Sequence, residues 1–156
     1  MKVPSGQKVE RSLIKSRGVA VIIPLLPKGR LILVRQLRVA VKKSIWEFPA
    51  GTLEKGEPAL RCASRELQEE TGWRADRIRK VLEYFPTPGV SDEKMHLFIA
   101  DRLKEGTHHK PDADEELEVK IFSASHVKRM IKGGEIIDGK TLLGFLYLQN
   151  SLQHQS

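Results

Sequence analysis

The sequence predicts an α+β fold, a mixed α/β sandwich rather than a helical bundle. Several short apolar runs, rich in β-branched residues, alternate with clear helical patterns along the chain. This is the order expected when strands and helices pack together as layers. The 156 residues suffice for one domain with its own hydrophobic core. Apolar residues make up 40% of the chain and charged residues 30%, which is typical of a globular protein and not of a disordered one.

The first half of the chain begins with three predicted strands. Residues 19–23 and 31–34 are apolar runs, and the turn residues 27–30 lie between them. This spacing predicts a β-hairpin. Residues 45–48 form a third short apolar run, which ends where Pro49, Ala50 and Gly51 follow.

Residues 58–70 predict the first helix. Pro58 suits the first helical position, because the N–H that proline lacks would have no partner there. Leu60, Ala63 and Leu67 recur at helical spacing and are expected to form its buried stripe. Gly72 is placed to cap the carboxyl end.

The second half predicts further strands at residues 80–85, 94–100 and 119–122. Ser123 is expected to cap a helix over residues 124–132, which the glycine pair at 133–134 would end. Asp138 or Thr141 is expected to start a last helix that runs through residue 152.

Composition restricts the class of partner and the compartment. The net charge of +7 is spread along the chain without aromatic interleaving, so it indicates no nucleic-acid partner. No apolar run approaches the roughly 20 residues that cross a bilayer. No apolar stretch follows Met1 as in a signal peptide. The single cysteine, Cys62, excludes an intramolecular disulfide and is expected to be a buried, inert thiol. We therefore expect a cytoplasmic protein without a membrane partner.

The helix at residues 58–70 carries a cluster of carboxylates. Residues three and four apart share a helix face, so Glu66, Glu69 and Glu70 gather on one side. Their mutual repulsion costs the helix a few tenths of a kcal/mol per pair, roughly. Oxygen clusters of this kind suit hard cations such as Mg²⁺, and Arg65 is placed to orient Glu69. Taken alone, the cluster is equally compatible with a solvated acidic face.

The residues around this cluster resemble the Nudix box. That pattern is a glycine, five residues, a glutamate, seven residues, and then Arg-Glu-aliphatic-any-Glu-Glu-any-Gly followed by an aliphatic residue. The stretch from Gly51 through Glu57 and Arg65 to Gly72 matches every fixed position. The one departure is Trp73, which replaces an aliphatic residue but remains apolar. A match this long is highly specific.

The resemblance implies a Nudix fold, an α-β-α sandwich in which the box forms a loop–helix–loop. It implies Mg²⁺ or Mn²⁺ as the cofactor. Glu66 and Glu70 are expected to ligate the metal, with Glu69 beside them and with the carbonyl oxygen of Ala50 completing the site. The resemblance gives supporting roles to Gly51, Glu57, Arg65 and Gly72, with Glu69 and Arg65 also serving catalysis.

Three stretches outside the box resemble the ADP-ribose pyrophosphatase (ADP-sugar diphosphatase) branch of the family: residues 34–38, 46–51 and 84–93. In that branch a proline about sixteen residues past the last box glycine is a marker, and Pro88 lies sixteen after Gly72. This resemblance implies a nucleoside-diphosphate sugar as substrate. The expected substrate contacts are Arg35, Arg38, Trp46, Glu47 and Pro88. The arginines are equally compatible with an exposed surface role, and either Trp46, Tyr84 or Phe85 is a candidate to stack on adenine rather than fill the core.

A second acidic cluster, at residues 112–118, lies between two predicted strands. In the similar enzymes a mobile loop here brings a glutamate to the attacking water as general base. Glu115 is the first candidate and Glu116 the second, and a solvated surface turn is the alternative.

The resemblance also implies a homodimer. Many ADP-ribose pyrophosphatases exchange a long N-terminal region between subunits, whereas only residues 1–16 precede the expected Nudix domain at 17–152. Residues 9–14 are a candidate strand within this segment, so the exchanged part must be smaller. Two rival functions remain at this point. One is a Nudix enzyme for another substrate (a different nucleotide sugar, coenzyme A, a nucleoside triphosphate or an RNA 5′ end), and the other is a non-catalytic binding module.

Overall fold

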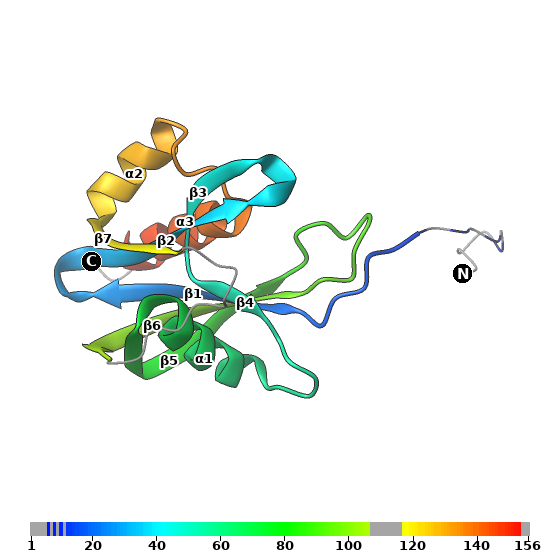
Figure 1. Cartoon of the computed structure of the whole chain (residues 1–156), viewed down its shortest axis with the longest axis horizontal. Coiled ribbons are helices and arrows are strands. Elements are labelled where there is room, and N and C mark those ends of the chain that lie inside the picture. Colours follow the sequence, from blue (N-terminus) through cyan, green and yellow to red (C-terminus); the bar gives the residue numbers. More distant parts are fainter. Residues whose placement is uncertain (1–5, 7, 9, 11, 107–116, 154–156) are drawn as a thin grey trace.

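The computed structural model describes residues 6, 8, 10, 12–106 and 117–153, and it has the predicted α+β architecture (Figure 1). Helices cover both faces of a mixed β-sheet. The elements, in chain order, are β1 (Val19–Leu26), the 3₁₀ turn η1 (Pro27–Gly29), β2 (Arg30–Arg38), the 3₁₀ turn η2 (Val39–Val41), β3 (Lys43–Glu47), β4 (Ala50–Thr52), α1 (Ala59–Thr71), β5 (Trp73–Tyr84), β6 (Met95–Glu105), β7 (Glu118–Ser123), α2 (Ala124–Lys132) and α3 (Gly139–Gln153).

The sheet is organised around β1. Its strand order is β3-β2-β1-β6-β5, with β4 also paired to β1 and β7 paired to β2. The β1–β6 pair is parallel, whereas β1–β2, β1–β4, β2–β3, β2–β7 and β5–β6 are antiparallel. The hairpin predicted for the first two strands is therefore confirmed, and its turn lies in η1. The short strand β4 lies against β1 and enters the box directly.

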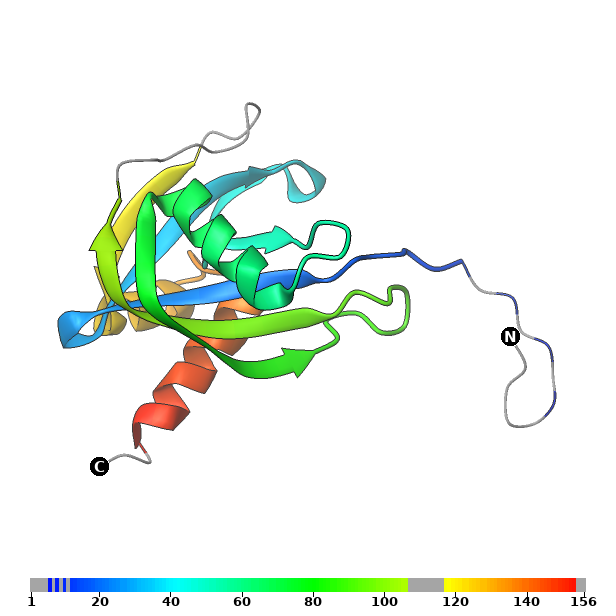
Figure 2. The ribbon, with the colours of Figure 1, turned by 90° about the horizontal axis from the view of Figure 1, so that it is seen from below.

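Alternate residues of β1 face two separate cores. Ala20 and Ile22 pack with Leu67 and Phe98 under α1. Val21 and Ile23 pack on the opposite side, in the cluster that includes Phe48, Phe145 and Leu148. Because side chains alternate along a strand, one central strand serves both layers. Figures 1 and 2 show α1 and α3 on opposite sides of β1, as this alternation requires.

Helix α1 follows the prediction with two corrections. It begins at Ala59, because Pro58 has the extended ψ of 137° and caps the helix instead of occupying its first position. Leu60 was expected in the buried stripe, but it is exposed, at 52%, while Cys62, Ala63 and Leu67 are buried. The buried stripe therefore contains Cys62 in place of Leu60. Gly72 caps the carboxyl end in the left-handed conformation, as predicted, and its N–H donates to the Gln68 carbonyl.

The other helices agree with the sequence, whereas strands β1, β2, β5 and β6 are longer than predicted. The side chain of Ser123 caps α2 by accepting from the His126 N–H. The Asp138 carboxylate accepts the Thr141 N–H at the start of α3. Strands β5 and β6 extend well beyond the apolar runs, because the additional paired residues are held by cross-strand ion pairs such as Arg77–Asp101. Within the described residues, no helix is both long and apolar enough to span a membrane.

The corrected burial of α1 gives a direct prediction for stability. Leu67→Ala is expected to lower the free energy of unfolding by about 2–5 kcal/mol, because it opens a cavity in a packed core. Leu60→Ala, its matched control on the exposed face of the same helix, is expected to change it by less than about 1 kcal/mol. Urea unfolding followed by circular dichroism measures both, and equal losses would contradict the observed orientation of α1.

Candidate active site

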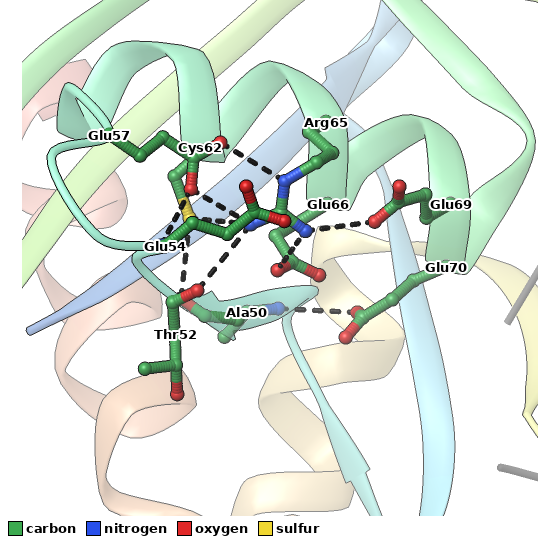
Figure 3. Close-up of polar contacts among 10 residues, drawn as sticks. Ala50, Thr52, Glu54, Glu57, Cys62, Arg65, Glu66, Glu69 and Glu70 are labelled. Carbon is green, nitrogen blue, oxygen red and sulfur yellow. Dashed lines mark hydrogen bonds and ion pairs between the residues drawn. The ribbon is translucent and has the colours of Figure 1, made fainter. Parts of the chain in front are cut away.

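Three glutamates of the box surround one arginine, and a fourth lies nearby. Glu57 lies in the loop before α1, and Glu66 and Glu69 lie on α1 beside Arg65. The Arg65 guanidinium donates from Nε and Nη2 to the two oxygens of Glu57, each at 3.0 Å. Its Nη1 donates to Glu66 Oε1 at 2.7 Å and to Glu69 Oε2 at 2.9 Å (Figure 3). Arg65 thus fixes the directions of three carboxylates, and Glu70 points instead toward Ala50.

These contacts shift the protonation equilibria of the group. The hydrogen bond to Glu57, above all, raises the pKa of Arg65 well above its usual range. In return, the hydrogen bond from Arg65 lowers the pKa of Glu57 to about 2. Glu57 is a side chain with only 6% exposure, so the pair is little screened by water. Both groups are therefore ionised at neutral pH.

The Glu57–Arg65 pair predicts a pH dependence of stability. A carboxyl whose pKa is depressed on folding contributes stability above its unfolded pKa, here about 4.5, and loses it as the pH falls through about 2. Glu57→Gln is therefore expected to be less stable than the wild type at pH 7, and the difference is expected to shrink between these two values. Urea unfolding at several pH values tests this. The control is Glu54→Gln on an exposed neighbour, and a difference that grows toward low pH would refute the assignment.

Gly51 allows α1 to approach β4 closely. A Cβ at this position would lie 1.9 Å from both Cδ and Oε1 of Glu66 and 2.4 Å from its Oε2. Any other residue would occupy the space that the Glu66 carboxylate takes. The requirement for glycine at the start of the box is therefore steric, since it lets a carboxylate of the helix rest on the strand backbone.

Glu70 is a buried acid, with 6% exposure, at the end of α1 nearest β4. Its Oε2 accepts the Ala50 N–H at 3.2 Å. A buried carboxylate is costly unless polar or cationic groups compensate it. This contact places the backbone of β4 beside Glu70, through the Ala50 N–H and not through the carbonyl that the resemblance implies as a ligand.

The candidate ligands are of the chemical type that binds hard divalent cations. Every candidate ligand is an oxygen: the carboxylates of Glu66, Glu69 and Glu70 and the carbonyl of Ala50. Among the described residues, no three histidine, cysteine or acidic side chains are arranged as a ready metal site. Arg65 accounts for this, because it holds one oxygen each of Glu66 and Glu69. A bound cation must compete with the guanidinium for these oxygens or use the other oxygen of each carboxylate.

Cys62 lies beside Gly51 and Arg65, but its thiol is expected to be unreactive. Its Sγ is buried, 3.5 Å from the carbonyl oxygen of Gly51 and 3.5 Å from Arg65 Nη2. Burial, and then the charges of Glu66 and Glu57, raise the pKa of the thiol to about 12. A thiol that stays protonated at neutral pH is a poor nucleophile, so the expectation of a buried structural cysteine agrees with the structure.

A second charged cluster joins β2, β3 and α3. Arg38 donates from Nε to Glu47 Oε1 at 2.8 Å and from Nη2 to Oε2 at 2.7 Å. Lys140 donates to the same Oε2 and, at 2.9 Å, to Asp138 Oδ1. The Thr141 hydroxyl donates to Asp138 and accepts the Phe48 N–H at 2.8 Å. The sequence singled out Arg38 and Glu47 as substrate contacts, whereas Lys140 lies in a stretch, residues 134–141, that also resembles the ADP-ribose pyrophosphatase branch but received no role. Its contact with Glu47 joins residues 93 positions apart.

The remaining expected substrate contacts are spread over the surface. Arg35 and Trp46 face each other across β2 and β3. Arg35 forms a 3.5 Å ion pair with Glu118, and the ring of Trp46 packs edge-on against Phe122 with the ammonium of Lys120 above it. Pro88 lies exposed in the loop between β5 and β6. The two base candidates, Glu115 and Glu116, lie outside the described residues.

An additional pocket adjoins the charged cluster. It has a volume of about 400 Å³ and is lined in part by Tyr84, Phe85, Asp138 and Lys140. Phe85 is exposed, so it is not the core residue that one interpretation of the sequence suggested. Tyr84 is half-buried, and burial, with the charges of Asp138 and Glu93, raises its pKa to about 12.

Known proteins resemble the chain along most of its length. Residues 15–143 match the family described as NUDIX domain. An ADP-ribose pyrophosphatase of Bacillus subtilis (strain 168) is 33% identical over 96% of this chain and 81% of its own. A GDP-mannose pyrophosphatase of Escherichia coli (strain K12) is 34% identical over 88% of this chain and 75% of its own. A methanol dehydrogenase activator of Bacillus methanolicus is 33% identical over 99% of this chain and 85% of its own. The crystal structure of an ADP compounds hydrolase superposes with a TM-score of 0.86 at 20% identity, over 99% of this chain and 84% of that one, which supports the fold.

Proposed function

Because the chain belongs to the NUDIX family, we propose that it is a pyrophosphatase that hydrolyses ADP-ribose or a related nucleoside-diphosphate sugar to a nucleoside monophosphate and a sugar phosphate. Water attacks one phosphorus, and the bond from this phosphorus to the bridging oxygen breaks. The observation that carries the proposal is the group of Glu57, Glu66 and Glu69 around Arg65, together with Glu70 against the backbone of β4. A non-catalytic module has no comparable need for four clustered carboxylates.

Glu66, Glu70 and the Ala50 carbonyl, with Glu69 beside them, would hold a divalent cation, for which Mg²⁺ or Mn²⁺ is our proposal. When bound, such a cation neutralises the diphosphate and lowers the pKa of the attacking water. The task of Arg65 is to orient Glu66 and Glu69 through the hydrogen bonds described above. Glu57 in turn fixes Arg65 with a bidentate contact.

The proposed substrate contacts are Arg35, Arg38, Trp46, Glu47 and Pro88, as the resemblance implies. Support for Arg38 comes from its surroundings, since Glu47 orients its planar guanidinium and about 40% of its side chain remains exposed to an anion. Glu115, or else Glu116, is proposed as the general base that takes the proton of the attacking water.

We also propose a cytoplasmic homodimer. Leu13 and Ile14 are apolar yet exposed, and Ile14 pairs with the loop between β5 and β6 through the Val90 carbonyl, at 2.9 Å. Figure 2 shows this part of the N-terminal segment beside that loop, projecting from the body of the protein. Exposed apolar side chains on a projecting segment favour a protein partner, and a second copy is the simplest one. Light scattering coupled to gel filtration measures the oligomeric state.

A panel of substrates with Mg²⁺ tests the proposed function. It contains ADP-ribose, ADP-glucose, GDP-mannose, NADH, dGTP and triphosphorylated RNA, with the products identified by chromatography. Release of a nucleoside monophosphate and a sugar phosphate from a nucleotide sugar is the expected result. Preferential release of orthophosphate or pyrophosphate from triphosphates would overturn it.

A further inference from the structure

The charged cluster at the start of α3 links this helix to the sheet through Arg38, Glu47, Asp138 and Lys140. Glu47 has only 2% side-chain exposure, yet it accepts from two cations, Arg38 on one side and Lys140 on the other. Lys140 is itself 11% exposed and is balanced by Asp138. Two positive and two negative groups thus form a compact set, in which Glu47, Lys140 and Asp138 are largely buried and Arg38 is 40% exposed. Its members come from β2, β3, the segment before α3, and α3.

One member of this cluster, Arg38, remains accessible to a further ligand. Arg38 uses Nε and Nη2 for Glu47, and none of its hydrogen bonds to the described residues involves Nη1. Its side chain is 40% exposed. Val34, Gln36 and Arg38 alternate onto the face of β2 that also bears Glu47, since Val34 and Glu47 are direct cross-strand partners. Glu47 therefore holds one edge of the Arg38 guanidinium, and 40% of the Arg38 side chain remains exposed.

Lys140 gives Glu47 a second cationic partner. Because Lys140 and Arg38 both donate to Glu47 Oε2, the carboxylate is held between α3 and β2, and its orientation toward Arg38 is fixed. Asp138 balances the ammonium of Lys140, so the contribution of Lys140 is to orientation and not to net charge. Burial alone would raise the pKa of Glu47, but the hydrogen bond from Arg38 and the charge of Lys140 lower it below its usual value. Glu47 therefore remains ionised.

The cluster is also connected to the candidate active site. The hydrogen bond and the charge of Glu47, and after them the charges of Asp138 and Glu70, raise the pKa of Arg38, against the opposing effect of burial. The residue after Lys140, Thr141, accepts the N–H of Phe48, two positions before Ala50. The first turn of α3 therefore fixes both Arg38 and the segment that leads into β4.

We propose that Lys140 is a positioning residue for substrate binding, which shares Glu47 with Arg38 and so holds the Arg38 guanidinium oriented toward the diphosphate. The inference rests on the proposed function, in which Arg38 contacts the substrate. The simplest alternative is that Lys140 only ties α3 to the sheet. These two roles differ in what they predict for substrate affinity.

The experiment compares Lys140→Met, which removes the ammonium but keeps the aliphatic stem, with Lys140→Arg, which keeps the charge. The matched control is Lys132→Met, on an exposed lysine of α2. We expect Lys140→Met to raise the KM for ADP-ribose about tenfold with kcat nearly unchanged, and Lys140→Arg to recover most of that loss. Lys132→Met is expected to behave as the wild type.

A double-mutant cycle separates positioning from general stability. In an Arg38→Met background, Lys140→Met is expected to change KM by less than about twofold, because the group it positions is gone. An equal rise in KM in both backgrounds would overturn the proposal, and so would a fall in kcat or melting temperature without a change in KM. If Lys140→Met does not fold, Lys140→Gln replaces it in the same cycle.

Binding of ADP in metal-free buffer gives a second readout that does not require turnover. Calorimetry is expected to show about tenfold weaker ADP binding for Lys140→Met and recovery for Lys140→Arg. Unchanged ADP affinity in Lys140→Met would refute the role of Lys140. If the wild type fails to hydrolyse any nucleotide sugar, the proposed function fails, but the ADP series still decides whether Lys140 positions an anion-binding arginine.

Discussion

Glu70→Gln is expected to abolish hydrolysis, with a fall in kcat of about a thousandfold or more, while the protein remains folded. Glutamine has the same shape as glutamate and can still accept the Ala50 N–H that Glu70 Oε2 accepts at 3.2 Å. It lacks the negative charge that a carboxylate ligand contributes to binding a divalent cation. Since Glu70 is buried, with 6% exposure, water cannot easily replace the lost ligand.

Three measurements test this expectation together: turnover of ADP-ribose over a range of Mg²⁺ concentrations, binding of Mn²⁺ by electron paramagnetic resonance, and thermal melting. The matched control is Glu135→Gln, an exposed glutamate outside α1, which should retain turnover and metal binding. A folded Glu70→Gln protein that is active at low Mg²⁺ would rule out Glu70 as a metal ligand.

Gly51→Ala is expected to cost nearly all activity while leaving stability almost unchanged. The new methyl group would lie 1.9 Å from the Glu66 carboxylate, so that carboxylate must move. It is the flexible end of a side chain, so the movement costs the fold little, and Gly51 has no positive φ that alanine would strain. The displaced Glu66 would lose its 2.7 Å contact with Arg65 and its position beside β4.

We expect kcat for ADP-ribose to fall about a hundredfold or more in Gly51→Ala, with a change of less than about 1 kcal/mol in the free energy of unfolding. Steady-state kinetics and urea unfolding measure the two quantities on the same preparation. Gly139→Ala serves as the control, since a Cβ at Gly139 meets no atom within 4 Å. Full activity in Gly51→Ala would mean that the position of Glu66 does not matter for the reaction.

The sequence predicted the fold class, the site helix and its capping glycine. These features depend on local patterns. Helical spacing places Glu66, Glu69 and Glu70 on one face, and Gly72 ends the helix because its backbone tolerates the left-handed conformation. The α+β architecture and the membership of the NUDIX family are confirmed by the sheet and by the matches to known proteins. The roles of the individual site residues stay predictions.

Some expectations were wrong where local patterns compete with packing. Leu60 shares helical spacing with Ala63 and Leu67, yet β1 and β6 bury the face that contains Cys62 instead. Strands β5 and β6 are longer than their apolar runs, because their charged residues pair across the strands rather than interrupt them. Neither outcome can be inferred from hydrophobic periodicity, since both depend on which neighbour covers which face.

The sequence by itself therefore determined the family and the candidate site residues, because the distances from Gly51 to Gly72 are fixed along one short stretch of chain. Only the tertiary structure decided how they are held. Gly51 is required because a strand and a helix approach until the Glu66 carboxylate rests on the strand backbone. Lys140 reaches Glu47 across 93 positions because α3 packs on the sheet, and a contact made by folding leaves no spacing in the sequence to detect.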